Sequence, residues 1–168
     1  MVPTGGKEPR QGVGHTAHPA SAVGRTFTVS EANAALPLVK AIVTDLVELS
    51  RDVAQRRQRL LSLSRPDRRR REDPYEEELI QMERELEADA QRIGEYVDEL
   101  RQLGVEAKSA TDGVVDFPAV LDGRLIYLCW QLGEPEVAHW HERDAGYRGR
   151  QRIDWVERGE AGADGKKE

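Results

Sequence analysis

The spacing of apolar residues along the chain changes near residue 104. Before that point, apolar residues recur every third or fourth position in a polar background, which is the period of one helix face. After it, β-branched and aromatic residues form short runs that turn-forming Gly, Asp and Pro separate. The change predicts an α+β domain. A long antiparallel, coiled-coil-like helical hairpin over residues 30–103 precedes a small antiparallel β-sheet with a Trp/His motif over residues 104–153.

The first predicted helix opens at Ser30, a residue type favoured as an N-cap, and Glu31 suits the positive end of the helix dipole. Its predicted apolar stripe is formed by Leu38, Ile42, Leu46, Leu49 and Val53. Pro37 lacks an N–H, and its ring clashes with the preceding turn. A helix that has already begun at Glu31 is therefore expected to bend or break near Ala34.

The second predicted helix runs from about Tyr75 to Leu103, and Gly104 follows it where a C-terminal cap belongs. Its heptad positions are Leu79, Leu86, Ile93 and Leu100. A narrow hairpin of two amphipathic helices leaves part of its apolar stripe uncovered. We therefore expect either the C-terminal region or a second copy of the chain to cover the remainder. The second alternative is a homodimer through this helical stripe, and a protein partner is a further possibility.

Turn signals divide the C-terminal segment into strands. The Asp122-Gly123 dipeptide lies between two apolar runs and predicts a tight β-hairpin. A Gly-Glu-Pro turn at residues 133–135 separates that hairpin from Val137–Glu142, which is expected to add a further strand. Pro118 has no N–H to donate, so it is expected at a sheet edge or a bulge.

Composition sets the limits of the domain. Residues 1–25 and 156–168 are polar and lack an apolar period, which predicts disordered tails on a single domain at residues 26–155. The formal net charge of -6 argues against a protein that wraps nucleic acid. Arg65 and the arginines at 68–71 form a basic cluster without an aromatic residue to stack on bases, so a solvated loop is expected there.

The single cysteine, Cys129, excludes an internal disulfide and fits a reducing compartment. The first residues contain no apolar run typical of a signal peptide, and no later run approaches the roughly 20 apolar residues that span a bilayer. We therefore expect a cytoplasmic protein with no membrane association.

Several short motifs follow one another in a distinctive order. The first helix start reads F-T-x-x-E-A-N-x-x-L-P, and the later chain contains D-F-P, L-C-W-x-L-G-E, W-H and D-A-G-Y-x-G-R. This succession, from about Arg25 to Ile153, resembles the bacterial family catalogued as domain of unknown function 2203. The resemblance implies a helical beginning and a tryptophan-containing C-terminal motif, and it transfers no catalytic residue.

Strand alternation suggests a metal site in the C-terminal segment. It places His139 and His141 on one face of their strand, opposite Trp140, and a suitable register would bring Cys129 beside them. The candidate metal ligands are Cys129, His139, His141 and Asp116, with Glu142 or Asp144 as alternative carboxylates. Such a nitrogen, sulfur and oxygen set suits zinc or another divalent transition metal. Cysteine is also common in ordinary cores, which leaves a purely structural role open.

A second interpretation gives the same segment a small polar ligand. His141 would act as a general acid or base that a carboxylate orients, beside a pocket walled by aromatic rings. The arginines of D-A-G-Y-R-G-R would grip a carboxylate or phosphate. The candidate ligand-binding residues are Trp130, Trp140, His141, Glu142, Asp144, Tyr147, Arg148 and Arg150.

Ordinary packing of the sheet on the hairpin explains most of these residues, but it leaves their polar variety between Trp130 and Arg150 unexplained. Three classes of function follow. We favour a self-associating interaction or scaffold protein. The alternatives are a protein that binds a metal or small ligand in the C-terminal sheet, and an enzyme at the same place. An enzyme would further need an open pocket and a perturbed titratable group.

Overall fold

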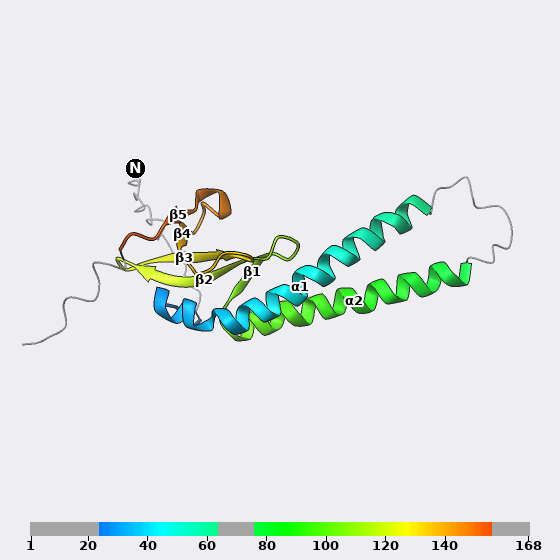
Figure 1. The fold of residues 1–168 in the computed structure, drawn as a ribbon, viewed down its shortest axis with the longest axis horizontal. Helices are drawn as coiled ribbons and strands as arrows, with labels where there is room; N and C mark the ends of the chain where they lie inside the picture. The colour runs from blue at the N-terminus through cyan, green and yellow to red at the C-terminus, as the bar shows by residue number, and fades with distance from the viewer. Residues whose placement is uncertain (1–23, 64–75, 156–168) are drawn as a thin grey trace, which may run out of the picture.

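The computed structural model describes residues 24–63 and 76–155 (Figure 1). The arginine cluster and all but the last two residues of the predicted N-terminal tail lie outside these ranges, as does the C-terminal tail. The helices are α1 (Val29–Leu63), α2 (Glu76–Gln102) and the short 3-10 helix η2 (Tyr147–Gly149). The strands are β1 (Glu106–Ser109), β2 (Val114–Leu121), β3 (Arg124–Gln131), β4 (His139–Glu142) and β5 (Gln151–Arg152). Two packed helices followed by an antiparallel sheet confirm the predicted α+β class.

A capping box starts α1. The Thr28 hydroxyl accepts a hydrogen bond from the Glu31 N–H at 3.1 Å, and the Glu31 carboxylate accepts one from the Thr28 N–H at 2.8 Å. The predicted cap at Ser30 was therefore wrong, because Thr28 is the residue with a glutamate three positions later. The helix also does not break near Ala34 but continues through Pro37.

The buried stripe of α1 differs in part from the predicted one. Ile42, Leu46 and Val53 are buried as expected, whereas Leu38 is 55% exposed, so the prediction was wrong at that position. The first turns bury a neighbouring set instead, formed by Ala32, Leu36, Val39 and Val43. Both sets have helical spacing, and the position of the sheet decides which of them is covered.

A Schellman motif ends α2 at the predicted glycine. Gly104 has a φ of +85°, and its N–H donates to the Arg101 carbonyl at 2.9 Å. The Val105 N–H donates to the Leu100 carbonyl, also at 2.9 Å. These bonds satisfy carbonyls at the helix end and turn the chain directly into β1.

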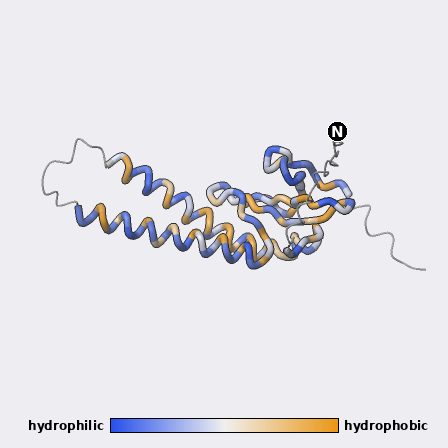
Figure 2. Tube along the Cα trace, turned by 180° about the vertical axis from the view of Figure 1, so that it is seen from behind, coloured by the Kyte–Doolittle hydropathy of each residue, from blue (hydrophilic) through white to orange (hydrophobic). Residues whose placement is uncertain are grey.

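The two helices reach well beyond the sheet at the end where residues 64–75 join them (Figure 1). We call this part, residues 53–63 and 76–90, the distal hairpin. Among the side chains described there, Val53 and Leu86 are buried and the others are exposed or half-buried. Figure 2 shows mostly hydrophilic residues along this end, whereas hydrophobic residues crowd together where the helices meet the sheet. An ion pair between Arg56 and Asp89 also links the two helices here.

The sheet is an antiparallel meander in the order β1-β2-β3-β4-β5. The predicted Asp122-Gly123 turn joins β2 to β3, and both of its residues have positive φ, at 50° and 75°. Gly113, before β2, has a φ of +66°, and a Cβ there would lie 2.7 Å from the Cβ of Leu132. This turn therefore requires glycine both for its backbone conformation and for its close packing.

Pro118 lies within β2, at a point where the strand has no β1 neighbour, since β1 pairs with β2 only at residues 114–116. Its carbonyl accepts a hydrogen bond from the Phe27 N–H at 2.7 Å, on the side away from β3. The nitrogen and carbonyl of one strand residue point the same way. The proline therefore removes no bond from the β2–β3 ladder, in agreement with the predicted edge position.

The two faces of the sheet differ in what covers them. Val115, Phe117, Leu128 and Trp130 belong to the face that packs on the helices, and all are at most 1% exposed. The Asn33 side chain ties α1 to the segment between β3 and β4, because its Oδ1 accepts a hydrogen bond from the Val137 N–H at 2.8 Å. Within the described residues, neither helix combines the length and apolarity needed to span a membrane.

Candidate metal centre

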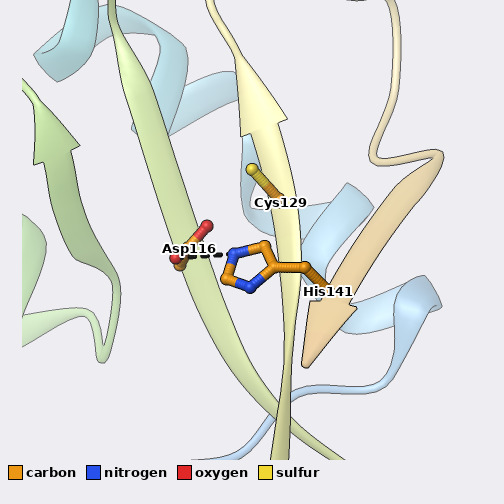
Figure 3. A group of neighbouring side chains, drawn as sticks. All are labelled: Asp116, Cys129 and His141. Carbon is orange, nitrogen blue, oxygen red and sulfur yellow. Dashed lines mark hydrogen bonds and ion pairs between the residues drawn. The ribbon is translucent and has the colours of Figure 1, made fainter. Parts of the chain in front are cut away.

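The opposite face of the sheet carries the site candidates. Asp116 on β2 pairs directly with Cys129 on β3, and Tyr127 on β3 pairs with His141 on β4. Because alternate residues of a strand share a face, this register places all four side chains on the face away from the helices. Figure 3 shows the His141 ring reaching across β3 toward Asp116, with Cys129 beside them and the helices behind the sheet.

Asp116, Cys129 and His141 form a compact buried cluster. Their ligand atoms all lie within 4.8 Å of one another, and the residues are 1%, 0% and 2% exposed, respectively. The Nε2 atom of His141 lies 3.0 Å from Oδ2 of Asp116. The structure thus brings together three of the four predicted metal ligands, each with a different donor element.

Hydrogen bonding fixes the tautomer of His141. Its Nδ1 lies 2.8 Å from the backbone carbonyl oxygen of Glu142, which can only accept, so Nδ1 carries a proton. Nε2 and Oδ2 of Asp116 then need one further proton between them to form their hydrogen bond. Removal of that proton would leave an Nε2 lone pair directed at the carboxylate, the arrangement in which a histidine binds a metal while its other nitrogen donates to a carbonyl.

The thiol of Cys129 and the carboxylate of Asp116 are both buried, and burial has a different consequence for each. Burial, and after it the negative charge of Asp116, raise the pKa of the Cys129 thiol from its ordinary 9.0 to about 12. The thiol is therefore protonated and unreactive at neutral pH. Among the described residues, no hydrogen bond of ordinary geometry reaches the buried Oδ1 atom of Asp116, and the Cys129 thiol is the donor that lies beside this carboxylate. Such an atom is costly to bury unless a donor or a cation satisfies it.

Tyr127 and Lys108 lie beside the cluster. The Tyr127 ring stacks on His141 with 5.7 Å between the ring centroids. The Nζ atom of Lys108 lies 5.2 Å from the Tyr127 ring centroid and 4.0 Å from Oδ2 of Asp116. The positive charge of Lys108 therefore partly balances Asp116 from the β1 side.

His139, the fourth predicted ligand, belongs to a separate group. Its Nδ1 lies 3.3 Å from a terminal nitrogen of Arg150 and 3.6 Å from a carboxylate oxygen of Glu134. The same Arg150 nitrogen donates to both Glu134 oxygens, at 2.6 and 2.7 Å, and to the Cys129 carbonyl at 3.3 Å. The arginine is thereby occupied within the protein rather than presented to solvent.

The other predicted ligand-binding residues are spread over the sheet. Trp130 and Trp140 lie on the helix-covered face, away from the His141 ring, and Trp140 packs edge-on against Trp155 at 5.2 Å between centroids. Trp130 borders a groove of about 1160 Å³ that runs between the start of α1 and residues 133–138. The structure therefore does not gather the tryptophans and His141 around one pocket.

The polar members of that set are near the surface. Glu142 forms an ion pair with Arg124 at 3.3 Å, whereas Asp144 and Arg148 are exposed. The Tyr147 hydroxyl donates to the side chain of Gln131 at 2.7 Å, and the Tyr147 ring lies 4.8 Å from the Arg150 guanidinium. Ligand binding by these residues stays a prediction.

Two residues around the site escaped the sequence analysis. Lys108 lies in the short strand β1, and no residue pattern predicts the bulge in the pairing of β1 with β2. Glu134 lies in a turn, where a carboxylate usually faces solvent, yet here it caps the Gln131 N–H at 2.9 Å and holds Arg150. Partial alternation of apolar and polar residues in V-E-A-K-S was the available signal for a strand at Lys108. No sequence signal pointed to the role of Glu134.

The chain matches the uncharacterised conserved protein family DUF2203 over residues 25–153. The match covers most of the sequence, so the protein belongs to this family, and the resemblance carried by the motifs is confirmed. No curated protein and no solved structure matches the chain.

Proposed function

We propose that this member of DUF2203 binds a divalent transition metal, most favourably zinc, through Asp116, Cys129 and His141. The observation that carries the proposal is the convergence of carboxylate, thiol and imidazole donors within 4.8 Å at a fully buried position. A thiolate and an imidazole favour zinc and related ions over magnesium or calcium. Three protein ligands leave one position of a tetrahedral ion for water or a further ligand.

The spacing of the donors supports a bound ion. Donors at zinc distances of about 2.0–2.3 Å lie roughly 3.4–3.6 Å apart in a tetrahedral site. The His141–Asp116 distance of 3.0 Å falls below this spacing and the 4.8 Å limit of the cluster lies above it. Small side-chain rotations are therefore enough to admit the ion without moving the strands.

The Oδ1 atom of Asp116 favours a metal over a purely structural pair, because within the described residues no hydrogen bond of ordinary geometry reaches it and the Cys129 thiol beside it is itself a metal ligand once ionised. A buried aspartate that served only to brace His141 would be expected to satisfy both oxygens within the protein. Once the proton shared by His141 and Asp116 and the proton of the Cys129 thiol have left, the cluster carries two negative charges, which a divalent cation compensates.

Metal binding would release protons from the site. The Cys129 thiol, whose pKa is raised to about 12, must lose its proton to coordinate the ion. The proton shared by Nε2 of His141 and Oδ2 of Asp116 must also leave. We expect about two protons to leave for each ion bound near neutral pH. Calorimetric titration in buffers of different ionisation enthalpy measures this number.

The test is metal content together with cobalt spectroscopy. Untagged wild-type protein, purified without chelator, is expected to hold about one ion per chain and to show a thiolate-to-cobalt charge-transfer band after cobalt substitution. Cys129→Ser should remove the band, whereas the matched control His139→Ala should keep it. The proposal fails if folded wild-type protein takes up neither zinc nor cobalt, or if Cys129→Ser retains the band.

Self-association through the helices is a second candidate function, and the sparse packing of the distal hairpin favours it. Leu61 and Ile80 are 75% and 42% exposed there.

The predicted cytoplasmic location suits a metal site that needs a reduced cysteine. This location stays a prediction, and so does an enzymatic role.

A further inference from the structure

The distal hairpin contains a groove of about 590 Å³ between its two helices. One wall is basic and comes from α1, through Arg56 and Arg59. The other wall is acidic and comes from α2, through Glu77, Glu78 and Glu85, with Met82 also in the lining. The groove therefore has opposite charges on its two sides.

Several of these charges have no ion-pair partner among residues 24–63 and 76–155. Arg56 is paired with Asp52 and Asp89. Over the residues that the structure describes, Arg59, Glu77 and Glu78 take part in no ion pair. Within the described part of the chain, Arg59 on one side of the groove and Glu77 and Glu78 on the other thus carry opposite charges that form no ion pair across it.

The apolar packing beneath the groove is thin. Val53 and Leu86 are the buried side chains among those described in the distal hairpin, whereas Met82, Leu79 and Leu60 are half-buried. Two isolated helices bury too little surface to be stable without further contacts. A second pair of helices laid over the groove would cover its apolar floor and complete a four-helix bundle.

We propose that the groove binds the distal hairpin of a second copy of this chain, with a two-fold axis parallel to the hairpin. This axis lays α1 of one protomer over α2 of the other, and the reverse contact follows from the symmetry. Each basic wall then faces an acidic wall. Both sheets lie at the same end of the dimer.

The charge pattern selects this axis over the alternative. A two-fold axis perpendicular to the hairpin would lay α1 over α1 and α2 over α2. That arrangement would oppose Arg59 to the basic wall of its partner, and Glu78 to the acidic wall. Like charges at close range are unfavourable, so the parallel axis gives the complementary interface.

The inference rests on the second candidate function, self-association, and is independent of the metal site. Sedimentation velocity of the full chain at increasing concentration is expected to show a monomer–dimer equilibrium. Arg59→Glu and Glu78→Arg should each raise the dissociation constant by at least about tenfold, because each change places like charges in both halves of the interface. Arg57→Glu, an exposed change on the same helix outside the groove, is the matched control and should leave association unchanged.

Mixing the two variants is the decisive experiment. In a heterodimer of Arg59→Glu with Glu78→Arg, both halves of the interface regain opposite charges, so the mixture should associate although neither variant does so alone. Circular dichroism of each variant checks that its helices are intact. Raising the ionic strength from about 0.05 to 0.5 M should weaken the wild-type dimer.

The possible results distinguish a wrong choice of interface from the absence of self-association. A wild-type chain that stays monomeric at every concentration overturns both. A dimer that resists both charge reversals overturns the groove as the interface while self-association stands. Folded variants that fail to associate when mixed overturn the arrangement of α1 over α2.

Discussion

The half of the molecule around the sheet and the distal hairpin are held together differently. Around the sheet, α1, the end of α2 and strands β2 and β3 bury a continuous core that includes Phe117, Trp130 and Leu46, each at most 1% exposed. The distal hairpin has two buried apolar side chains among those described, and many of its exposed residues are charged. One half is thus organised by packing within the chain, whereas the other presents surface on which a partner can act.

This difference teaches where each proposed function belongs. A metal centre needs donors held in place by rigid neighbours, and the paired strands β2, β3 and β4 supply them. An interface needs surface that the monomer leaves incompletely covered. The two proposals therefore occupy opposite ends of the molecule and can fail separately.

The largest expected effect is on the stability of the half of the molecule around the sheet. Phe117 packs edge-on against Phe27 at 5.2 Å between ring centroids and is 0% exposed. Phe117→Ala should lower the free energy of unfolding by about 3–5 kcal/mol, through lost burial and the cavity left behind. Leu61→Ala in the distal hairpin should change it by less than about 0.5 kcal/mol. Guanidinium denaturation measures both, and similar losses would contradict the comparison.

A smaller change tests the distal hairpin alone. Leu86 is 5% exposed, and Leu86→Ala should cost about 2 kcal/mol, the lower end for a buried leucine, because nearby side chains can relax toward water. Hydrogen exchange should show faster amide exchange at residues 79–90, with unchanged protection in β2 and β3. Equal loss of protection in both regions would show that the two halves unfold as one unit.

The next effect comes from the outer face of the sheet in chelator-treated protein. Burial raises the pKa of Cys129 from 9.0 to about 12, so above pH 9 the thiol ionises in the unfolded chain before it does in the folded one. Folding stability should therefore fall as pH rises, by about 1.4 kcal/mol between pH 8 and pH 10. Cys129→Ala should lack this component in parallel denaturation curves. Parallel pH dependence in the two proteins would contradict it.

The smallest expected effect is at the start of α1. Thr28→Ala removes the hydroxyl that caps the Glu31 N–H, and should lower the free energy of unfolding by about 1 kcal/mol. Thr28→Ser retains the hydroxyl and should recover most of that loss. Thermal melts of the three proteins compare them directly. An unchanged alanine variant would show that this helix end does not depend on its cap.

Much of the fold was predictable because periodicity reports which residues can share a face. The hairpin, the Gly104 cap and the Asp122-Gly123 turn were all predicted from local patterns. The errors at Ser30 and Leu38 came from competing local solutions. Two possible caps lie two residues apart, and Glu31 favours Thr28 through the capping box. Two apolar sets share the helical spacing, and contacts with the distant sheet made the choice between them.

The candidate site was predictable only as a set of possibilities. Alternation placed the histidines of β4 on a common face, but the pairing register decided which side chains would meet. His141 faces Asp116, whereas His139 is drawn to Glu134 and Arg150, neither of which the sequence analysis had linked to it. Metal binding itself stays a prediction.

The bond between Asn33 and Val137 has a consequence for the way the protein is made. The two residues are 104 positions apart. At a synthesis rate of about 5–20 residues per second, Asn33 leaves the ribosome roughly 5–20 s before Val137 leaves it. During that interval the stripe formed by Leu36, Val39 and Val43 lacks the strands that cover it in the finished chain. The newborn helix is therefore a segment that chaperones can hold, and a ribosome stalled before Val137 would display it.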